Sequence, residues 1–282
     1  MWFPILLPFD SIHPHGILEG DPVKIRFVLP ALAAILGLSC DGPTGPYEDF
    51  RKLYPTVLRP LPPADLDSAK ARLNAKLGTF YKATLDNFGL LGSSGFLSRG
   101  RSSMTDTAQA LSIVKQGFVR LSEFSGVRDT ADLVVAEIRH GLNVVLTDWA
   151  ISFSLQRYDG MEVHGTWLHA VLTDSSLDLR NHHYGEFYIP PFNVISRSEA
   201  REYWIGRDIE YHCWVPSVHH ITDESIDTGE IERCVYPLAS PDSVVMHVAW
   251  KIPVKPYGQP MWFIYTDVIT GELIAMEQLF IC

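Results

Sequence analysis

The 282-residue sequence lacks the short motifs that mark common catalytic sites. It has no His-Glu-x-x-His, in which two histidines one helical turn apart bind zinc, so a zincin site is excluded at the level of the motif. It also has no Gly-x-Ser-x-Gly nucleophile elbow, phosphate-binding loop or dinucleotide-binding glycine pattern. We therefore expect no catalytic residues and no cofactor.

Metal-ligand patterns are also scarce. No two of the four cysteines form a Cys-x-x-Cys pair, which argues against a zinc ribbon or a thioredoxin-like site. Histidines gather at 182–183, 212 and 219–220, with Asp223 and Glu224 nearby. They do not show paired ligands at helical or strand spacing together with a third partner. We expect histidines in solvent-facing loops and no metal site.

The chain has fewer basic than acidic residues. The chain has 23 lysines and arginines against 33 acidic residues, for a formal net charge of −10. Phosphate backbones repel such a chain unless it carries a dense basic patch. The densest basic cluster, Arg99 and Arg101 with Lys115 and Arg120 further along, is too thin for that. We expect no nucleic-acid partner.

No apolar run is long enough to span a bilayer. The run from Phe27 to Leu38 has about 12 residues, and a spanning helix needs roughly 20. Lys24 and Arg26 precede this run, and small residues lead from it to Cys40. This order of charge, apolar run and small residues is typical of a secretory signal.

The end of this signal resembles that of a bacterial lipoprotein, in which the cysteine becomes the lipidated first residue. Residues 1–39 are then the signal peptide and 40–63 a lipid-anchored tether, although Gly37 stands where such signals usually have leucine. We expect the true start near Val23, with 1–22 upstream of it. The alternative is a buried helix that ends at a free Cys40. The lipoprotein interpretation predicts a lipid-anchored protein on the periplasmic or extracellular face of a bacterial envelope.

Export would allow disulfide formation. Cys213 and Cys234 enclose 20 residues, and closing such a loop is worth roughly 3 kcal/mol in the chain-entropy model. We expect these two cysteines to pair, with Cys282 as a competing partner.

Helical spacing of apolar residues marks two segments in the first part of the chain. Leu66, Ala69, Leu73 and Leu77 predict a helix that starts near Ala64. The glycine- and serine-rich stretch 89–103 predicts a loop. A second helix is capped at 105–107 and ends at Gly126; its apolar stripe is Leu111, Val114, Phe118 and Leu121.

Strands follow each helical stretch. A period of two predicts a strand through Trp149, Ile151 and Phe153, and further strands follow at 163–173 and 187–189. After a capping box at Ser196 and Glu199 and a short helix, the pattern predicts an irregular segment and then three strands. That irregular segment is 206–236, and the strands are 244–254, 261–267 and 273–280. Helices and antiparallel strands in this order predict an α+β fold with sheets packed by helices, in two similar units.

Two stretches resemble a known family. The pattern Gln-x-Tyr-x-Gly-x-x-Val-x-Gly at 156–165 resembles the turn motif of the propeptide (FTP) domain of thermolysin-like metalloproteases and fungalysins. The stretch 248–274 is similar to the final hairpin of the PepSY-type domain in the same propeptides. The resemblance covers about 107–280. It implies an FTP-like unit at 64–192 and a PepSY-like, cystatin-like unit at 193–282.

The resemblance implies structural roles for four turn residues. Gly160 and Gly165 suit turn or bulge positions, Asp267 can accept hydrogen bonds from turn amides, and Gly271 can take a positive φ. The resemblance implies no chemistry at any of them.

The expected function is therefore binding. Such propeptides fold beside a protease, assist its folding and block its cleft, which implies a non-catalytic lipoprotein that inhibits or chaperones an envelope protein such as a metalloprotease. One alternative is a structural accessory subunit of a membrane protein complex, and another is an enzyme with an unrecognised site. Trp214 is our candidate for a partner contact.

Overall fold

The computed structural model describes residues 53–77, 83–98, 106–141, 149–212, 216–256, 258 and 260–280. The predicted signal peptide and most of the predicted tether, including Cys40, lie outside these residues. No helix within the described ranges has the length and apolar character needed to cross a membrane.

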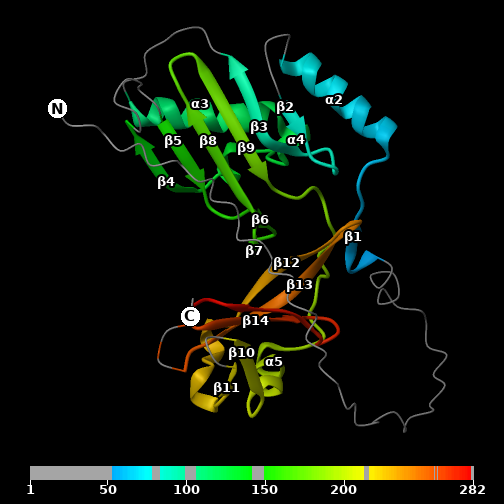
Figure 1. The fold of residues 1–282 in the computed structure, drawn as a ribbon, viewed down its shortest axis with the longest axis vertical. Coiled ribbons are helices and arrows are strands. Elements are labelled where there is room, and N and C mark those ends of the chain that lie inside the picture. Colours follow the sequence, from blue (N-terminus) through cyan, green and yellow to red (C-terminus); the bar gives the residue numbers. More distant parts are fainter. Residues whose placement is uncertain are drawn as a thin grey trace. The chain divides into compact units, whose positions relative to one another are not determined.

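The fold is α+β, as predicted. Its first sheet has the strand order β2-β3-β9-β8-β5-β4, and every pair in it is antiparallel (Figure 1). The strands are β2 (Ala83–Leu85), β3 (Leu91–Ser98), β4 (Val135–His140), β5 (Trp149–Phe153), β8 (Trp167–Leu172) and β9 (Ser176–His182). Helix α3 (Thr107–Arg120) lies against β5, β8 and β9, and α2 (Pro63–Leu77) contacts β2.

The first core lies between α3 and one face of this sheet. Val114 and Phe118 of α3 are fully buried, as is Ile151 of β5, and the rings of Phe118 and Phe153 meet edge to face at 5.8 Å. The side chain of Asp106 caps α3 by accepting a hydrogen bond from Ala108 N at 2.7 Å. The predicted helix stripe is therefore confirmed as core.

The second sheet has the order β15-β14-β13-β12-β7-β6, and β1 also pairs with β13. Its strands are β1 (Thr56–Leu58), β6 (Arg157–Tyr158), β7 (Met161–Val163), β12 (Glu232–Ser240), β13 (Ser243–Val254), β14 (Trp262–Asp267) and β15 (Leu273–Gln278). The pair β7–β12 is parallel, although we expected antiparallel pairs throughout. A parallel pair needs a long connection, and nearly 70 residues separate these two strands.

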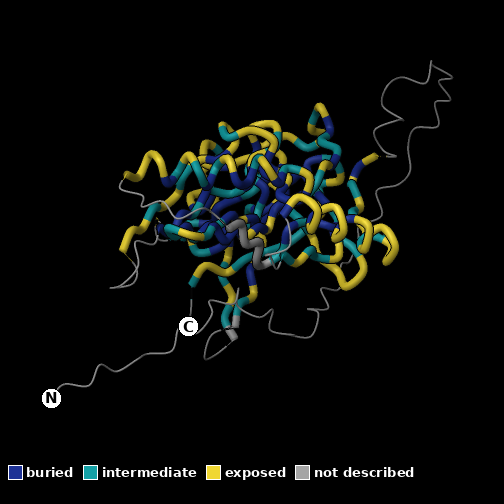
Figure 2. Tube along the Cα trace, turned by 90° about the horizontal axis from the view of Figure 1, so that it is seen from above, coloured by how far each residue is buried: buried dark blue, intermediate teal, exposed yellow. Residues whose placement is uncertain are grey.

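The second core covers one face of this sheet. Five residues of β13 are buried on this face as their alternation predicted: Val244, Met246, Val248, Trp250 and Ile252. Helix α5 (Arg197–Trp204) contacts β13, and Ser196 and Glu199 form the predicted capping box. Two further strands, β10 (Asp208–His212) and β11 (Pro216–His220), form a hairpin. Figure 2 shows buried positions gathered inside the trace and exposed positions along its outside.

Several predicted elements were wrong. The stretch 89–103, predicted as a loop, contains β3, because its backbone pairs with both β2 and β9. The segment 206–236, predicted as irregular, contains β10, β11 and the start of β12, with two 3₁₀ turns (Asp223–Ser225 and Thr228–Glu230) between β11 and β12. Residues 187–189 form no strand, and β4 and β9 were not predicted. For β3, pairing with the distant strand β9 outweighed the local glycine- and serine-rich pattern.

The predicted domain boundary does not follow the sheets. Strands β1, β6 and β7 precede residue 193 in the sequence, yet they belong to the second sheet. The division into units at 64–192 and 193–282 remains a prediction.

Candidate functional site

The second sheet carries its unusual side chains on the face opposite its core. Because residues directly opposite each other in a ladder point to the same side, the register defines this outer face. Its members are Val57, Glu232, Cys234, Tyr236, Leu238, Val245, His247, Ala249, Lys251, Phe263, Tyr265, Asp267 and Glu277, together with Glu162 and His164 at the end of β7.

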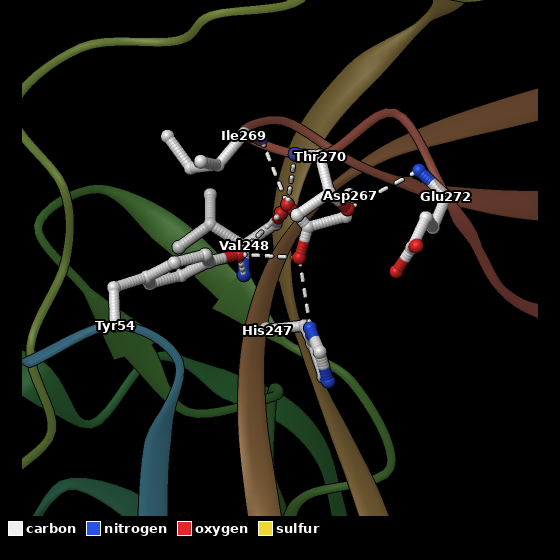
Figure 3. Close-up of polar contacts among 7 residues, drawn as sticks. All are labelled: Tyr54, His247, Val248, Asp267, Ile269, Thr270 and Glu272. Atoms are coloured by element: carbon white, nitrogen blue, oxygen red, sulfur yellow. Dashed lines mark hydrogen bonds and ion pairs between the residues drawn. The ribbon is translucent and has the colours of Figure 1, made fainter. Parts of the chain in front are cut away.

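A gap in the ladder of β13 lies at the centre of the site. Strand β1 pairs with β13 up to Met246, and β14 pairs with it from Ala249 onward. Between them, the Val248 N–H donates to the hydroxyl of Tyr54 at 2.9 Å. This hydroxyl in turn donates to Asp267 Oδ2 at 2.7 Å (Figure 3). Tyr54 thus takes the place of a missing strand partner.

Asp267 joins this gap to the β14–β15 turn. Its Oδ1 accepts hydrogen bonds from the backbone N–H of Ile269 at 2.8 Å and of Thr270 at 3.0 Å, the turn contacts expected of it. Its Oδ2 accepts from Tyr54 and lies 2.8 Å from His247 Nδ1, and the sequence indicated neither contact. Figure 3 shows these groups converging on one carboxylate.

The carboxylate of Asp267 is charged although it is only 2% exposed. Burial by itself raises the pKa of Asp267, but hydrogen bonds from His247, the Thr270 amide and Tyr54 outweigh it and hold the pKa below its usual value. Burial, together with the negative charge of Asp267, raises the pKa of Tyr54, so its hydroxyl keeps its proton.

A second carboxylate on the same face has similar partners. Glu277 accepts a hydrogen bond from the Tyr265 hydroxyl at 2.9 Å and one from the Tyr236 hydroxyl at 3.3 Å, and its Oε1 lies 2.7 Å from His164 Nε2. The His164 ring stacks on Tyr236 with centroids 5.0 Å apart. Burial raises the pKa of Glu277, but its contacts with His164 and the two tyrosines lower it by more.

One end of the outer face is apolar and exposed. Val57, Val245 and Leu238 lie directly opposite one another on β1, β13 and β12. Val57 is 45% exposed and Leu238 42%, and Val245 is half-buried. We call these three side chains the apolar row. At the other end of the face, the ammonium of Lys251 lies 4.2 Å from the centre of the Phe263 ring.

The predicted turn glycines occupy the expected conformations. Asp159 and Gly160 have φ of 50° and 77° and close the β6–β7 hairpin, as required in a type I′ turn. Gly165 has φ of 70° and Gly271 has φ of 74°. A Cβ at Gly271 would lie 3.4 Å from the Ile195 side chain, which is an ordinary contact, so the positive φ rather than lack of space favours glycine there.

The predicted cysteine and tryptophan roles stay predictions. Cys213, Trp214, Cys40 and Cys282 lie outside the described residues. Cys234 is a free, buried thiol in this structure, and burial raises its pKa to about 12. The structure therefore does not contain the bond we expected at Cys234.

The histidines do not all lie in solvent-facing loops, so that prediction was wrong. His183 is buried, and His219 belongs to β11, where its ring stacks on Trp262 at 5.2 Å. Within the described ranges, no group of three or more His, Cys, Asp or Glu side chains is arranged to hold a metal ion.

The carboxylate clusters join segments that are distant in the sequence. Asp267 connects the segment before β1 to β13 and the β14–β15 turn, and Glu277 connects β15 to the end of β7. In the part of the chain that the structure describes, no serine, threonine or cysteine side chain hydrogen-bonds to His247 or His164. These groups order the outer face.

Tyr54, His247, His164 and Glu277 were not predicted as site residues from the sequence. One signal was available: the alternation along β13 puts His247 on the side away from the core. Nothing local indicates Tyr54, because its role arises only when β1 and β14 share β13.

Comparisons with known proteins place the chain in no family. No family model matches it, and no curated protein matches it. Among solved structures, the C-terminal domain of YpeB from Bacillus megaterium is similar over 79% of this chain and 99% of that chain, with 10% identity and a TM-score of 0.29. A likeness at that level carries no argument about function.

Proposed function

We propose that this chain is a non-catalytic module that binds another envelope protein on the outer face of its second sheet. The observation that carries the proposal is the apolar row. Three apolar side chains lie in register on neighbouring strands, and Val57 and Leu238 remain more than two-fifths exposed. Burying the exposed part of each would contribute on the order of 1 kcal/mol.

The fixed geometry of the face supports this role. Preorganised surfaces bind more tightly because less side-chain freedom is lost on association. The Asp267 and Glu277 clusters hold Tyr54, Tyr236 and Tyr265 in place by hydrogen bonds. Of the three, Tyr236 is partly exposed, and tyrosine is among the residues enriched in protein interfaces.

Charge indicates the chemistry of the partner. The chain as a whole has a formal net charge of −10. A partner that presents an apolar patch with a basic rim would be complementary.

The resemblance to metalloprotease propeptides refines this proposal. It supports an inhibitor or folding assistant of an envelope metalloprotease, held at the membrane by a lipid on Cys40. An accessory subunit of a membrane complex could use the same face, so the identity of the bound protein separates the two roles.

Site-specific photo-cross-linking in native envelopes tests the proposal. A photoreactive amino acid replaces Leu238 or Val57 in the full chain, and Val134, which is 52% exposed and precedes the first sheet's strand β4, serves as the matched control position. We expect Leu238 and Val57 to cross-link to the same protein, identified by mass spectrometry, and Val134 not to do so.

Two results would contradict the proposal. One is an absence of cross-links at both outer-face positions. The other is an identical set of cross-links from Val134, which would indicate non-specific capture. A cross-linked protein counts as the partner only if it also binds the purified chain.

A further inference from the structure

His247 borders the apolar row on the outer face of the second sheet. It lies two residues after Val245 on β13, which puts both side chains on one face about 7 Å apart along the strand. Tyr236 lies directly opposite His247 on β12, and the Tyr54 ring meets the imidazole edge to face at 6.5 Å between ring centres. A protein that covers the apolar row would therefore meet His247 as well.

The two ring nitrogens of His247 have different surroundings. Nδ1 lies 2.8 Å from Asp267 Oδ2, and the other ring nitrogen points away from this carboxylate (Figure 3). A charged carboxylate can only accept hydrogen bonds, so Nδ1 carries the proton. Nε2 has no hydrogen-bond partner among the described residues and is not buried, and the side chain is 19% exposed. In neutral His247, Nε2 therefore presents a lone pair to the solvent.

Asp267 makes this lone pair a strong acceptor. A carboxylate that binds one ring nitrogen of a histidine raises the basicity of the other nitrogen. Asp267 is charged and buried, and in the part of the chain that the structure describes no lysine or arginine forms an ion pair with it. Its charge is not neutralised while His247 is neutral, and water screens it poorly because it is buried. A cation at Nε2 would be attracted by this charge.

Given docking on the outer face, we propose that the bound protein presents a lysine or arginine side chain that donates a hydrogen bond to His247 Nε2. Hydrogen bonds from cationic donors are stronger than those from neutral donors. The partner would carry this basic group beside the apolar patch that covers Val57, Val245 and Leu238. A basic group on the partner also complements the formal net charge of −10 on this chain.

This contact should be lost at acidic pH. Protonation of His247 turns Nε2 into a positively charged donor, which repels a cation, and histidine is the side chain that changes charge between about pH 5 and pH 8. The groups that face it keep their charge in this range. Hydrogen bonds outweigh burial and hold the pKa of Asp267 below its usual value, and burial raises the pKa of Tyr54 and of Tyr236. Glu277, which accepts from Tyr236, has a lowered pKa.

Two matched variants separate Nε2 from the rest of the face. H247N leaves a side-chain N–H in the place of Nδ1 to donate to Asp267, and it removes Nε2. H220N is the control, because His220 Nδ1 also lies 2.8 Å from a carboxylate, that of Asp208, on the β10–β11 hairpin. Circular dichroism checks that both variants fold.

The affinity of the purified full-length chain for the protein that cross-links at Leu238 is measured at about pH 7.5 and about pH 5.5. At the higher pH, H247N should raise the Kd about tenfold, and H220N should change it by less than about twofold. At the lower pH, the Kd of the wild type should rise until it matches that of H247N. The comparison with H247N removes changes that come from His164 or from the partner.

Nuclear magnetic resonance of the full-length wild type tests the tautomer without a partner or a variant. Long-range proton–nitrogen spectra at about pH 8 should show His247 with a proton on Nδ1 and none on Nε2. A proton on Nε2 at that pH would overturn the inference, because the acceptor would be missing.

The binding results distinguish this inference from the proposed function. If a protein cross-links at Leu238 but wild type and H247N bind it equally at about pH 7.5, this inference alone fails. If no protein cross-links at Leu238, the proposed function fails and this inference fails with it. An equal loss of affinity in H220N would also overturn the assignment to His247.

Discussion

The two sheets bury similar apolar faces but differ on their outer faces. The outer face of the first sheet carries ion pairs between residues two apart on the same strand. Glu137 and Arg139 form one at 2.7 Å with more than half of the arginine side chain exposed, and Arg180, about half exposed, pairs at 3.2 Å with Asp178, which is buried. An exposed ion pair such as Glu137–Arg139 contributes at most about 1 kcal/mol.

The outer face of the second sheet is organised differently. Its carboxylates are held by tyrosines and histidines from other strands, and Asp267 and Tyr265 are fully buried. Its apolar row is exposed, whereas the first sheet's strands expose one large apolar side chain, Trp167, among the residues that the structure describes. A face that is rigidly built yet leaves apolar groups in water suits a binding surface better than a solvated one.

The largest expected effect is on stability and concerns the core of the first sheet, where buried apolar contacts supply most of the stability. Phe118→Ala should lower the free energy of unfolding by about 3–5 kcal/mol, because Phe118 is fully buried against the sheet. Urea denaturation of the full chain measures this loss, and Val218→Ala, at a residue 60% exposed, should change stability by less than about 0.5 kcal/mol. Similar losses in the two variants would contradict the assigned core.

The stability of the second sheet should depend on the buried charge of Asp267. Asp267→Asn should cost about 2–3 kcal/mol, because it weakens hydrogen bonds to Tyr54, His247 and two turn amides. Asp227→Asn is the control, since exposed Asp227 bonds the single amide of Gly229 and its loss should cost about 1 kcal/mol or less.

The same variant tests the sign of the pH dependence. The pKa of Asp267 is lowered in the folded state, so its contribution is present above the unfolded value of about 3.9 and is lost as pH falls through the folded pKa. The difference in unfolding free energy between wild type and Asp267→Asn should therefore shrink on acidification. A difference that grows as pH falls would rule out the ionised carboxylate.

His183 should make the stability of the fold depend on pH in a second range. Burial lowers the pKa of His183 to about 3. Because the unfolded chain binds the proton more readily, His183 should destabilise the fold as pH falls from about 6.5 toward 3, by about 1.4 kcal/mol per pH unit. His183→Gln should flatten the urea-measured stability between pH 6 and pH 4, and an unchanged slope would contradict this assignment.

The smallest expected effect on stability is at the apolar row. Leu238→Asp places a charge where the wild-type side chain is already 42% exposed, so unfolding free energy should change by less than about 1 kcal/mol. A loss above about 2 kcal/mol, measured by urea denaturation, would show that Leu238 belongs to the folded core.

Local sequence signals predicted the elements that local contacts specify. The stripe of α3, the capping box at Ser196, the Asp159–Gly160 turn and the alternation of β13 all hold in the structure. Each depends on residues that are close together in the sequence, so the local sequence pattern is enough to predict it.

Some of the remaining features depend on partners far along the chain. Strand β3 is rich in glycine and serine and becomes a strand because it lies between β2 and β9. Strand β12 contains Pro237, which usually argues against a strand, yet β7 covers β12 only at Cys234 and Val235, so no neighbour on that side needs the missing N–H. The Tyr54–Asp267 bond joins residues 213 positions apart, which no local pattern can indicate.

The affinity of purified Leu238→Asp for the cross-linked partner tests the central claim most directly, with Val134→Asp as the matched control. A docking role for the outer face predicts that Leu238→Asp raises the Kd at least about tenfold, while Val134→Asp changes it by less than about twofold. Equal affinities for wild type and Leu238→Asp, with circular dichroism showing both folded, would contradict the proposed function.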